Sequence, residues 1–345
     1  MTDAELAKAV EVIPGRVWYV VVRVIPHPRH DIAWVDAETP YHYWPFFEDY
    51  GPVSLGNLHR FCTAMNGAMK DRAASGKRVM VFSGPHGHKR ANAVFLLASW
   101  SLLFQNRSPD EAYRPFARLR PVIAPWHDAT PHADDFHLTT LDVLRGIAKA
   151  RDCGFLTPFE HFDLPEYEHY EKVENGDMNW IVDGRFLAFA GPHDARACTP
   201  EGYVTTAVDD LVPHFKRKGV AAVVRLNKKY YNEKRFKDAA IAHHDMYYLD
   251  GSNPPEPILQ RFLAVCEATQ GACARARAAA AGDAASARAA RCARAPNSTL
   301  ALAHALPAHP RSSLPCTPGR VVQAPLQCTA RRGWGAPAPA LARTS

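Results

Sequence analysis

The stretch with the clearest chemical potential is residues 83–90, Ser-Gly-Pro-His-Gly-His-Lys-Arg. The short apolar run at 77–82 predicts a buried strand before it, and residues 91–104 predict a helix after it. A strand, a glycine loop and a helix N-terminus together form a layout that cradles phosphate groups. The loop contains no cysteine, so a purely structural role is the alternative to phosphate binding.

Acidic residues form the second group. Glu168 and Glu171 lie three residues apart, so a helix presents both carboxylates on one face, and Asp177 follows closely. A run of charges is most often a solvated surface, and the spacing alone does not exclude that interpretation. Asp250 follows the predicted strand 245–249 and precedes a glycine, as a turn aspartate in many proteins does.

Net charge gives no indication of a nucleic-acid partner. The chain has 345 residues and a formal charge of +6. Asp283 is the single acid after Gly271, whereas arginine recurs throughout that segment. The positive surplus therefore comes from the C-terminal part, and the preceding residues are slightly acidic.

Metal, disulfide and membrane functions are not expected. The eight cysteines are scattered without paired spacing, which indicates a reducing compartment and neither disulfides nor zinc. The histidine pairs at 86/88 and 243/244 lack cysteine or carboxylate partners at ligand spacing. No N-terminal stretch has a secretory pattern, and the longest apolar run, 93–104, is far short of the ~20 residues of a membrane helix.

The elements that must position these residues alternate between strand and helix. In the second half, predicted strands at 186–189, 220–226 and 245–249 alternate with predicted helices at 208–218, 230–240 and 255–267. This order predicts an α/β domain with a parallel or mixed sheet covered by helices. No further strand is expected, because residues 273–345 are rich in Ala, Arg and Pro and predict disorder.

Several long motifs occur in a characteristic order. They include Tyr-Glu-His-Tyr-Glu-Lys-Val-Glu-Asn-Gly-Asp at 167–177 and Arg-Leu-Asn-Lys-Lys at 225–229. Shorter motifs lie at 49–55, 89–93, 186–193, 234–236 and 250–252. Over about residues 17–272 the chain thus resembles the cell-division-cycle-fourteen family of dual-specificity protein phosphatases, and the resemblance implies an enzyme that removes phosphate added by cyclin-dependent kinases.

The resemblance implies two tandem dual-specificity-phosphatase-like domains of α/β class. We expect a non-catalytic N-terminal domain at 1–158, an interdomain linker helix at 159–178, a catalytic domain at 179–272 that is truncated before its catalytic loop, and a disordered tail at 273–345. In this arrangement the loop at 83–90 is a structural relic. Nuclear and cytoplasmic localisation, with centrosomes or spindle poles, is also implied, whereas the oligomeric state is not.

The resemblance also assigns roles to individual residues. Asp250 matches the general acid, which protonates the departing serine or threonine oxygen. Glu168, Glu171 and Asp177 match an acidic groove that receives a basic residue downstream of a phospho-Ser-Pro site. The partners implied are phosphoprotein substrates of cyclin-dependent kinases, and no metal or organic cofactor is implied.

One departure from the family decides whether this chain is active. The family nucleophile lies in His-Cys-x5-Arg, where backbone N–H groups lower the thiol pKa and the arginine binds phosphoryl oxygens. The aligned stretch starts at Cys273 and lacks both the preceding histidine and an arginine six residues later. Catalytic cysteine and arginine are therefore missing in frame.

The motif is present in another reading frame. Permitted codons for residues 327–338, read from the third base of the first codon, translate to Val-His-Cys-Lys-Ala-Gly-Leu-Gly-Arg-Thr-Gly. Codons for Gly271 and Gln323 also permit splice-site sequences. We hypothesise that about 271–323 is translated intron, followed by exon in the wrong frame.

Three functions follow from these observations. The first is a dual-specificity phosphatase of this family, represented by a chain that is inactive as written. The second is a genuine truncated isoform, a pseudophosphatase that binds phosphoproteins without catalysis. The third is an unrelated α/β binding protein with a basic nucleic-acid-binding tail.

Overall fold

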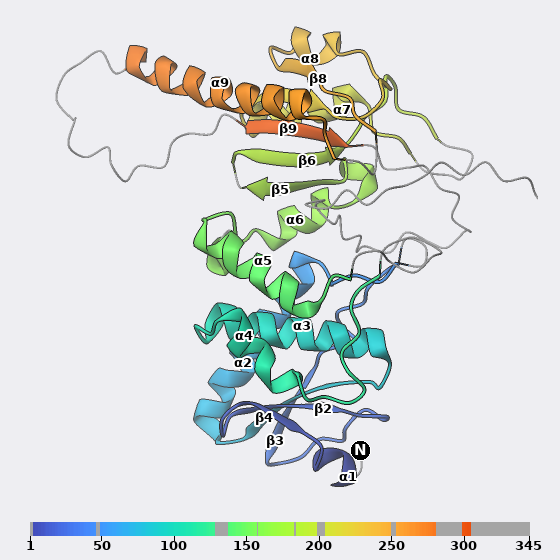
Figure 1. Ribbon diagram of the computed structural model, residues 1–345, viewed down its shortest axis with the longest axis vertical. Helices are drawn as coiled ribbons and strands as arrows, with labels where there is room; N and C mark the ends of the chain where they lie inside the picture. Colours follow the sequence, from blue (N-terminus) through green and yellow to red (C-terminus); the bar gives the residue numbers. More distant parts are fainter. Residues whose placement is uncertain are drawn as a thin grey trace, which may run out of the picture. The chain divides into compact units, whose positions relative to one another are not determined.

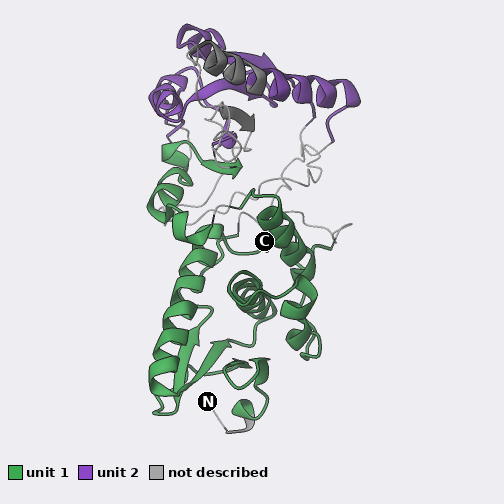
Figure 2. Cartoon of the chain, turned by 90° about the vertical axis from the view of Figure 1, so that its left-hand side faces the viewer, with its two compact units in different colours: residues 1–183, 312–322 green, residues 184–311, 323–345 purple. Residues whose placement is uncertain are grey.

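The computed structural model describes residues 3–45, 49–127, 137–156, 158–182, 184–198, 204–249, 253–280 and 299–304. These residues form two compact units, one up to residue 182 and the other from Gly184 to His304 (Figure 1, Figure 2). Both units contain a sheet flanked by helices, which confirms the expected α/β class. The domain bounds expected from the sequence stay a prediction.

The sheet of the first unit is mixed and has the order β1-β2-β4-β3. Its strands are β1 (Val10–Ile13), β2 (Val17–Val21), β3 (Ile32–Asp36) and β4 (Arg78–Ser83). β4 pairs in parallel with both β2 and β3, and β1 pairs antiparallel to β2. The central β4 is buried from Val79 to Ser83, as expected from its continuous apolar run.

The helices of the first unit pack on this sheet or on one another. They are α1 (Asp3–Leu6), α2 (Leu55–Ser75), α3 (Gly87–Phe104), α4 (Pro109–Tyr113), α5 (Thr140–Asp152) and α6 (Leu164–Tyr170). Short 3-10 turns lie at Arg114–Phe116, Phe159–His161 and Val173–Asn175, and strand β5 (Met178–Val182) follows.

Helix α3 lies at the centre of the first unit. It contacts α2, α4, α5 and β4, and its residues from Arg90 to Leu102 are all buried. A helix that is apolar on every side is stable only when neighbours enclose it. Trp100 is fully buried, and its indole N–H donates to Asn66 Oδ1 over 2.9 Å. The helix begins at Gly87, inside the loop predicted at 83–90, rather than at residue 91.

The second unit contributes four strands in the order β6-β9-β7-β8, all parallel to their neighbours. They are β6 (Phe186–Ala190), β7 (Val220–Arg225), β8 (Ala242–Asp245) and β9 (Thr299–His304). The helices are α7 (Val208–Arg217), α8 (Lys234–Asp238) and α9 (Glu256–Ala280).

The two faces of this sheet bury different side chains. Ala222 and Val224 point to one face, where Ile258 and Phe262 of α9 pack. Figure 1 shows α9 lying along that face. On the other face Phe215 of α7 packs edge-to-face against Phe189 of β6. Successive side chains of a strand point to opposite faces of the sheet, so α9 and α7 pack against different residues of the same strands.

The expectation that no central strand follows β8 is wrong. Thr299–His304 lies between β6 and β7, with Leu302 opposite both Ala188 and Val224. Helix α9 also continues to Ala280, beyond the predicted domain end at 272. A buried central position accepts a short segment without charge or proline, and Thr-Leu-Ala-Leu-Ala-His meets both conditions. The rest of the tail predicted at 273–345 lies outside the described residues.

Candidate functional site

The carboxyl ends of the four parallel strands in the second unit share one sheet edge. His304 pairs with Ala190 at the end of β6, and Arg225 pairs with both Ala303 and Asp245. In open α/β sheets ligands bind outside the carboxyl ends of the strands. This edge is therefore the candidate active-site edge of the second unit.

Arg225 is the buried charge at this edge. Its side chain is 2% exposed, its Nε forms an ion pair with Asp245 Oδ1 at 2.6 Å, and its Nη1 donates to the Tyr231 carbonyl over 2.8 Å. The guanidinium also lies 4.6 Å from the centre of the Tyr231 ring. A buried charge is tolerated because such partners replace its water shell. Arg225 thus ties the end of β7 to the end of β8.

His243 is linked to this arginine through Tyr231. The Tyr231 hydroxyl and His243 Nε2 are 2.9 Å apart, and the His243 ring stacks on Phe236. Burial and then the neighbouring Arg225 charge lower the pKa of His243 to about 4. His243 is therefore neutral at physiological pH.

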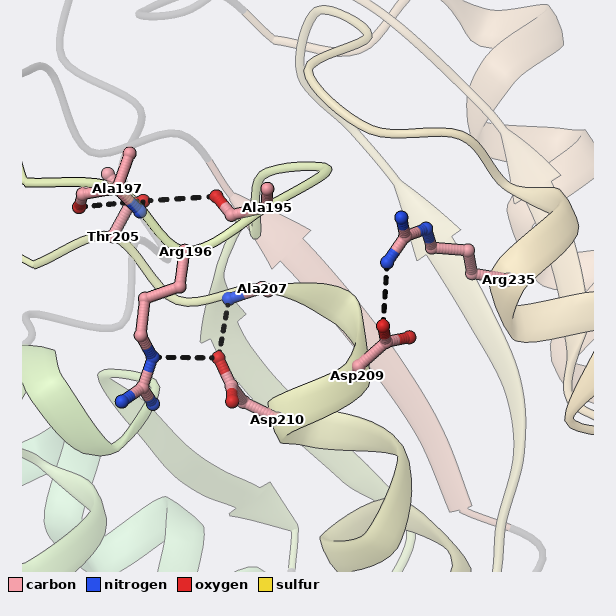
Figure 3. A network of polar contacts seen from close by, with 8 residues as sticks. All are labelled: Ala195, Arg196, Ala197, Thr205, Ala207, Asp209, Asp210 and Arg235. Atoms are coloured by element: carbon pink, nitrogen blue, oxygen red, sulfur yellow. Dashed lines mark hydrogen bonds and ion pairs between the residues drawn. The ribbon is translucent and has the colours of Figure 1, made fainter.

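Figure 3 shows the polar network between β6 and α7. Asp210 Oδ2 accepts from the Ala207 N–H over 2.9 Å and from Arg196 Nε over 3.2 Å. Asp209 Oδ2 accepts from Arg235 Nη1 over 2.7 Å, which connects α7 to α8. These contacts fix the segment after β6 to the start of α7, where the Asp210 carboxylate binds the N-cap N–H of Ala207.

Asp250, the predicted general acid, lies outside the described residues. The segment leading to it leaves the candidate edge directly after β8. The Met246 N–H donates to the Arg225 carbonyl over 2.9 Å, and Leu249 is 67% exposed. The segment 246–249 thus runs from the sheet edge into solvent. The role of Asp250 as general acid stays a prediction.

The predicted acidic group lies in the first unit and divides into two environments. Glu168 is partly exposed on α6, and both its oxygens bind Arg60 of α2, over 2.8 and 2.6 Å. Glu171 and Asp177 are instead 5% and 2% exposed. The carboxylates therefore do not form the single solvated face that is the ordinary interpretation of a charge run.

Burial changes the protonation of Glu171. Its pKa is raised to about 7, chiefly by desolvation. A hydrogen bond from the Tyr167 hydroxyl opposes the rise, and repulsion from Asp177 and Glu168 contributes to it. Asp177 has a backbone φ of 46°, a left-handed conformation that asparagine and aspartate adopt more readily than most residues. The structure thus brings these acids into electrostatic contact, while their binding role stays a prediction.

Polar groups of the loop at 83–90 have hydrogen-bond and ion-pair partners within the chain. Ser83 Oγ and the Tyr19 hydroxyl are 2.7 Å apart, and both residues are buried. The Gly84 N–H donates to Glu38 Oε2 over 2.7 Å, and Lys89 pairs with the other oxygen of Glu38. Glu38 was not predicted, because nothing in the sequence connects it to a loop 46 residues away.

The central strand β9 carries a second signal that sequence reasoning missed. His304 is the last residue of β9, Ala305 follows it, and Arg311 lies six residues after Ala305. This is the spacing of His-Cys-x5-Arg with alanine in place of cysteine. Residues 305–311 lie outside the described residues, so this observation concerns their sequence alone.

The described part of the chain contains neither a group of metal ligands nor a membrane-spanning helix. There, no three histidine, cysteine or acidic side chains are grouped to hold a metal ion. Within the same ranges, no helix combines the length and apolar character that crossing a membrane requires.

Known proteins match the chain over most of its length. A family model for the N-terminal half of dual specificity protein phosphatases matches residues 11–150. Dual specificity protein phosphatase CDC14A of Mus musculus is 40% identical over 273 residues, which are 79% of this chain and 45% of that protein. CDC14B of Mus musculus is 37% identical over 262 residues, 76% of this chain and 54% of that protein.

A more distant relative gives the same result. Tyrosine-protein phosphatase CDC14 of Saccharomyces cerevisiae is 32% identical over 269 residues, 76% of this chain and 48% of that protein. The chain thus spans about half the length of these relatives. These matches confirm the resemblance that the motifs indicated: over most of its length, the chain resembles the CDC14 dual-specificity protein phosphatases.

Proposed function

We propose that the gene encodes a protein phosphatase acting on Pro-directed phospho-Ser and phospho-Thr sites in cell-cycle control. The observation that carries the proposal is the 40% identity to CDC14A over 79% of the chain. In the intact enzyme a cysteine attacks phosphorus, Asp250 protonates the departing oxygen, and water then hydrolyses the cysteinyl-phosphate. The expected partners are phosphoproteins, specifically substrates of cyclin-dependent kinases, in the nucleus and cytoplasm.

The acidic residues support the proposed preference for a basic residue after the phosphosite. Glu171 and Asp177 are buried carboxylates and Glu168 is a partly exposed one, all within ten residues of each other. The attraction between these carboxylates and a substrate cation is stronger than it would be in water, because the buried surroundings screen charge poorly. The preference is tested by comparing phospho-Ser-Pro peptides with lysine or with alanine three residues later.

Turnover by this chain is not expected, since no cysteine stands in frame within a Cys-x5-Arg motif. The test is a phosphatase assay of the purified chain with a phospho-Ser-Pro-x-Lys peptide. The protein encoded by the mature spliced transcript serves as the positive arm, and its cysteine-to-serine variant serves as the control. Turnover by the present chain would refute its proposed inactivity.

A non-catalytic phosphoprotein-binding isoform is the second candidate. The observation that favours it is β9, which occupies the centre of the second sheet and is followed by Ala305 rather than by cysteine. Transcript sequencing separates the two candidates. A dominant mature message that still encodes residues 271–323 supports the isoform, and a message that lacks them supports the translated-intron hypothesis.

A further inference from the structure

Glu38 is a carboxylate held over the loop that connects β4 to α3. One oxygen accepts the Gly84 N–H over 2.7 Å, and the other pairs with Lys89 in the first turn of α3. The side chain of Glu38 is 24% exposed, whereas that of Lys89 is 51% exposed. The carboxylate is thus the less exposed member of the pair and lies against the backbone.

The backbone before Glu38 directs it to this position. Asp36, the last residue of β3, accepts the Glu38 N–H over 2.8 Å and the Thr39 N–H over 3.0 Å. The Ala37 N–H donates to the Phe82 carbonyl of β4 over 3.0 Å. Asp36 thus forms an Asx turn directly after β3. The hydrogen bonds of this turn fix the backbone of Glu38.

Gly84 leaves room for this close approach. A Cβ atom at position 84 would lie 2.9 Å from Glu38 Oε2, closer than Cβ contacts normally are. A side chain at this position would therefore displace the end of the Glu38 side chain from its place against the Gly84 N–H.

Positive charge surrounds the same place. Lys89 contacts the carboxylate directly, whereas the buried Arg90 on the same turn donates to the Pro121 carbonyl. Arg90 and Glu38 also act in opposite directions on the pKa of Tyr19, whose hydroxyl meets the loop residue Ser83. A backbone N–H and a lysine are groups that bind oxyanions, and here both bind an internal carboxylate.

We propose that Glu38 is a self-inhibiting anion: it occupies the oxyanion position of the β4–α3 loop and excludes phosphate from the first unit. Phosphate and the carboxylate compete for the same donors, Gly84 N–H and Lys89. Removing the carboxylate leaves these donors free and removes a negative charge that repels the incoming anion. This inference concerns the first unit and does not depend on catalysis by the second.

Inorganic phosphate titrated into the full chain by calorimetry tests the proposal, with chloride at equal ionic strength as the blank. Glu38→Ala is expected to bind phosphate about tenfold more tightly than wild type, a change of about 1.4 kcal/mol. The double variant Glu38→Ala/Lys89→Ala is expected to lose this gain. Any phosphate site elsewhere in the chain contributes equally to all these proteins and cancels in the comparison.

Glu11→Ala is the matched control. Glu11 Oε1 accepts the Gly15 N–H over 2.7 Å, so this variant also removes a carboxylate from a glycine N–H, but no cation pairs with Glu11 in the described contacts. It is expected to bind phosphate as wild type does. If Glu38→Ala does not fold, Glu38→Gln keeps the size and the acceptor and is expected to give a smaller gain. Equal phosphate affinity in wild type and the folded Glu38 variant, or a gain that survives the loss of Lys89, overturns the proposal.

Discussion

The Tyr167 hydroxyl donates a hydrogen bond of 3.2 Å to Glu171 Oε1, one helical turn further along the chain. The Tyr167 ring packs against Gly56 in the first turn of α2. The contact therefore joins α6 to the first turn of α2 and encloses the Glu171 carboxyl in the process. Its burial connects the acidic group to the stability of the first unit.

Because the pKa of buried Glu171 is raised, we expect the stability of the folded chain to fall as pH rises through neutrality. Its pKa in the folded chain is about 7, raised by burial from an ordinary value of 4.5. The folded state therefore holds a proton that the unfolded state releases between these values. The stabilisation is complete below pH ~4.5 and is lost as pH rises through about 7, by at most about 3 kcal/mol.

Urea denaturation at pH 5, 6, 7 and 8, roughly spanning this window, measures the effect. Glu171→Gln remains uncharged at every pH, so its unfolding free energy is expected to vary less across the series. A wild-type and a Glu171→Gln profile that run parallel would contradict the assigned burial.

Because Arg60 binds both oxygens of Glu168, we expect it to compete with a ligand cation for this carboxylate. Both guanidinium nitrogens that contact Glu168 lie on a partly exposed side chain, and such pairs contribute about 1 kcal/mol or less. Arg60→Ala is therefore expected to leave stability nearly unchanged while it strengthens binding of a phospho-Ser-Pro-x-Lys peptide. Fluorescence anisotropy with a labelled peptide measures the affinity.

The control for this experiment is Arg145→Ala, which breaks a comparable exposed pair with Asp110 on other helices. Glu168→Gln is expected to weaken peptide binding, in the opposite direction to Arg60→Ala. If Arg60→Ala also weakens binding, Arg60 contacts the ligand itself and does not compete with it.

Arg225 predicts a large loss of stability in the second unit. Its removal leaves the Tyr231 carbonyl without its donor and Asp245 without its buried partner. Arg225→Ala is expected to cost about 3 kcal/mol, and Arg225→Lys recovers only part of this because lysine lacks the planar fork. Chemical denaturation with Arg235→Ala as the exposed-pair control measures both changes. A cost of Arg225→Ala no greater than that of Arg235→Ala would show that the buried contacts contribute little.

The position of β9 predicts sensitivity to proline. Leu302 lies between β6 and β7, so Leu302→Pro removes a donor from a central strand and adds a ring that clashes with its neighbours. Amides of β6 and β7 are expected to lose hydrogen-exchange protection in this variant, whereas Leu302→Val keeps the donor and retains protection. Unchanged protection in Leu302→Pro would exclude Thr299–His304 as the central strand.

Local patterns determined much of the framework before any contact was known. The apolar run at 77–82 matches β4, and the pattern at 220–226 matches β7 within one residue. These predictions succeed because strand and helix periods are properties of neighbouring residues. Helix ends are less certain: α3 begins four residues early because His86, at its N-cap, accepts the His88 N–H.

Tertiary structure decided the rest. The spacing of Glu168 and Glu171 is visible in the sequence, but only the folded chain brings the arginine of α2 to one and buries the other, which raises its pKa. Glu38 and its loop are likewise 46 residues apart. Charge state and pairing depend on which distant groups exclude water, and a linear pattern does not contain that information. The central place of β9 has the same origin, since composition predicts disorder there and only the gap between β6 and β7 gives the segment partners.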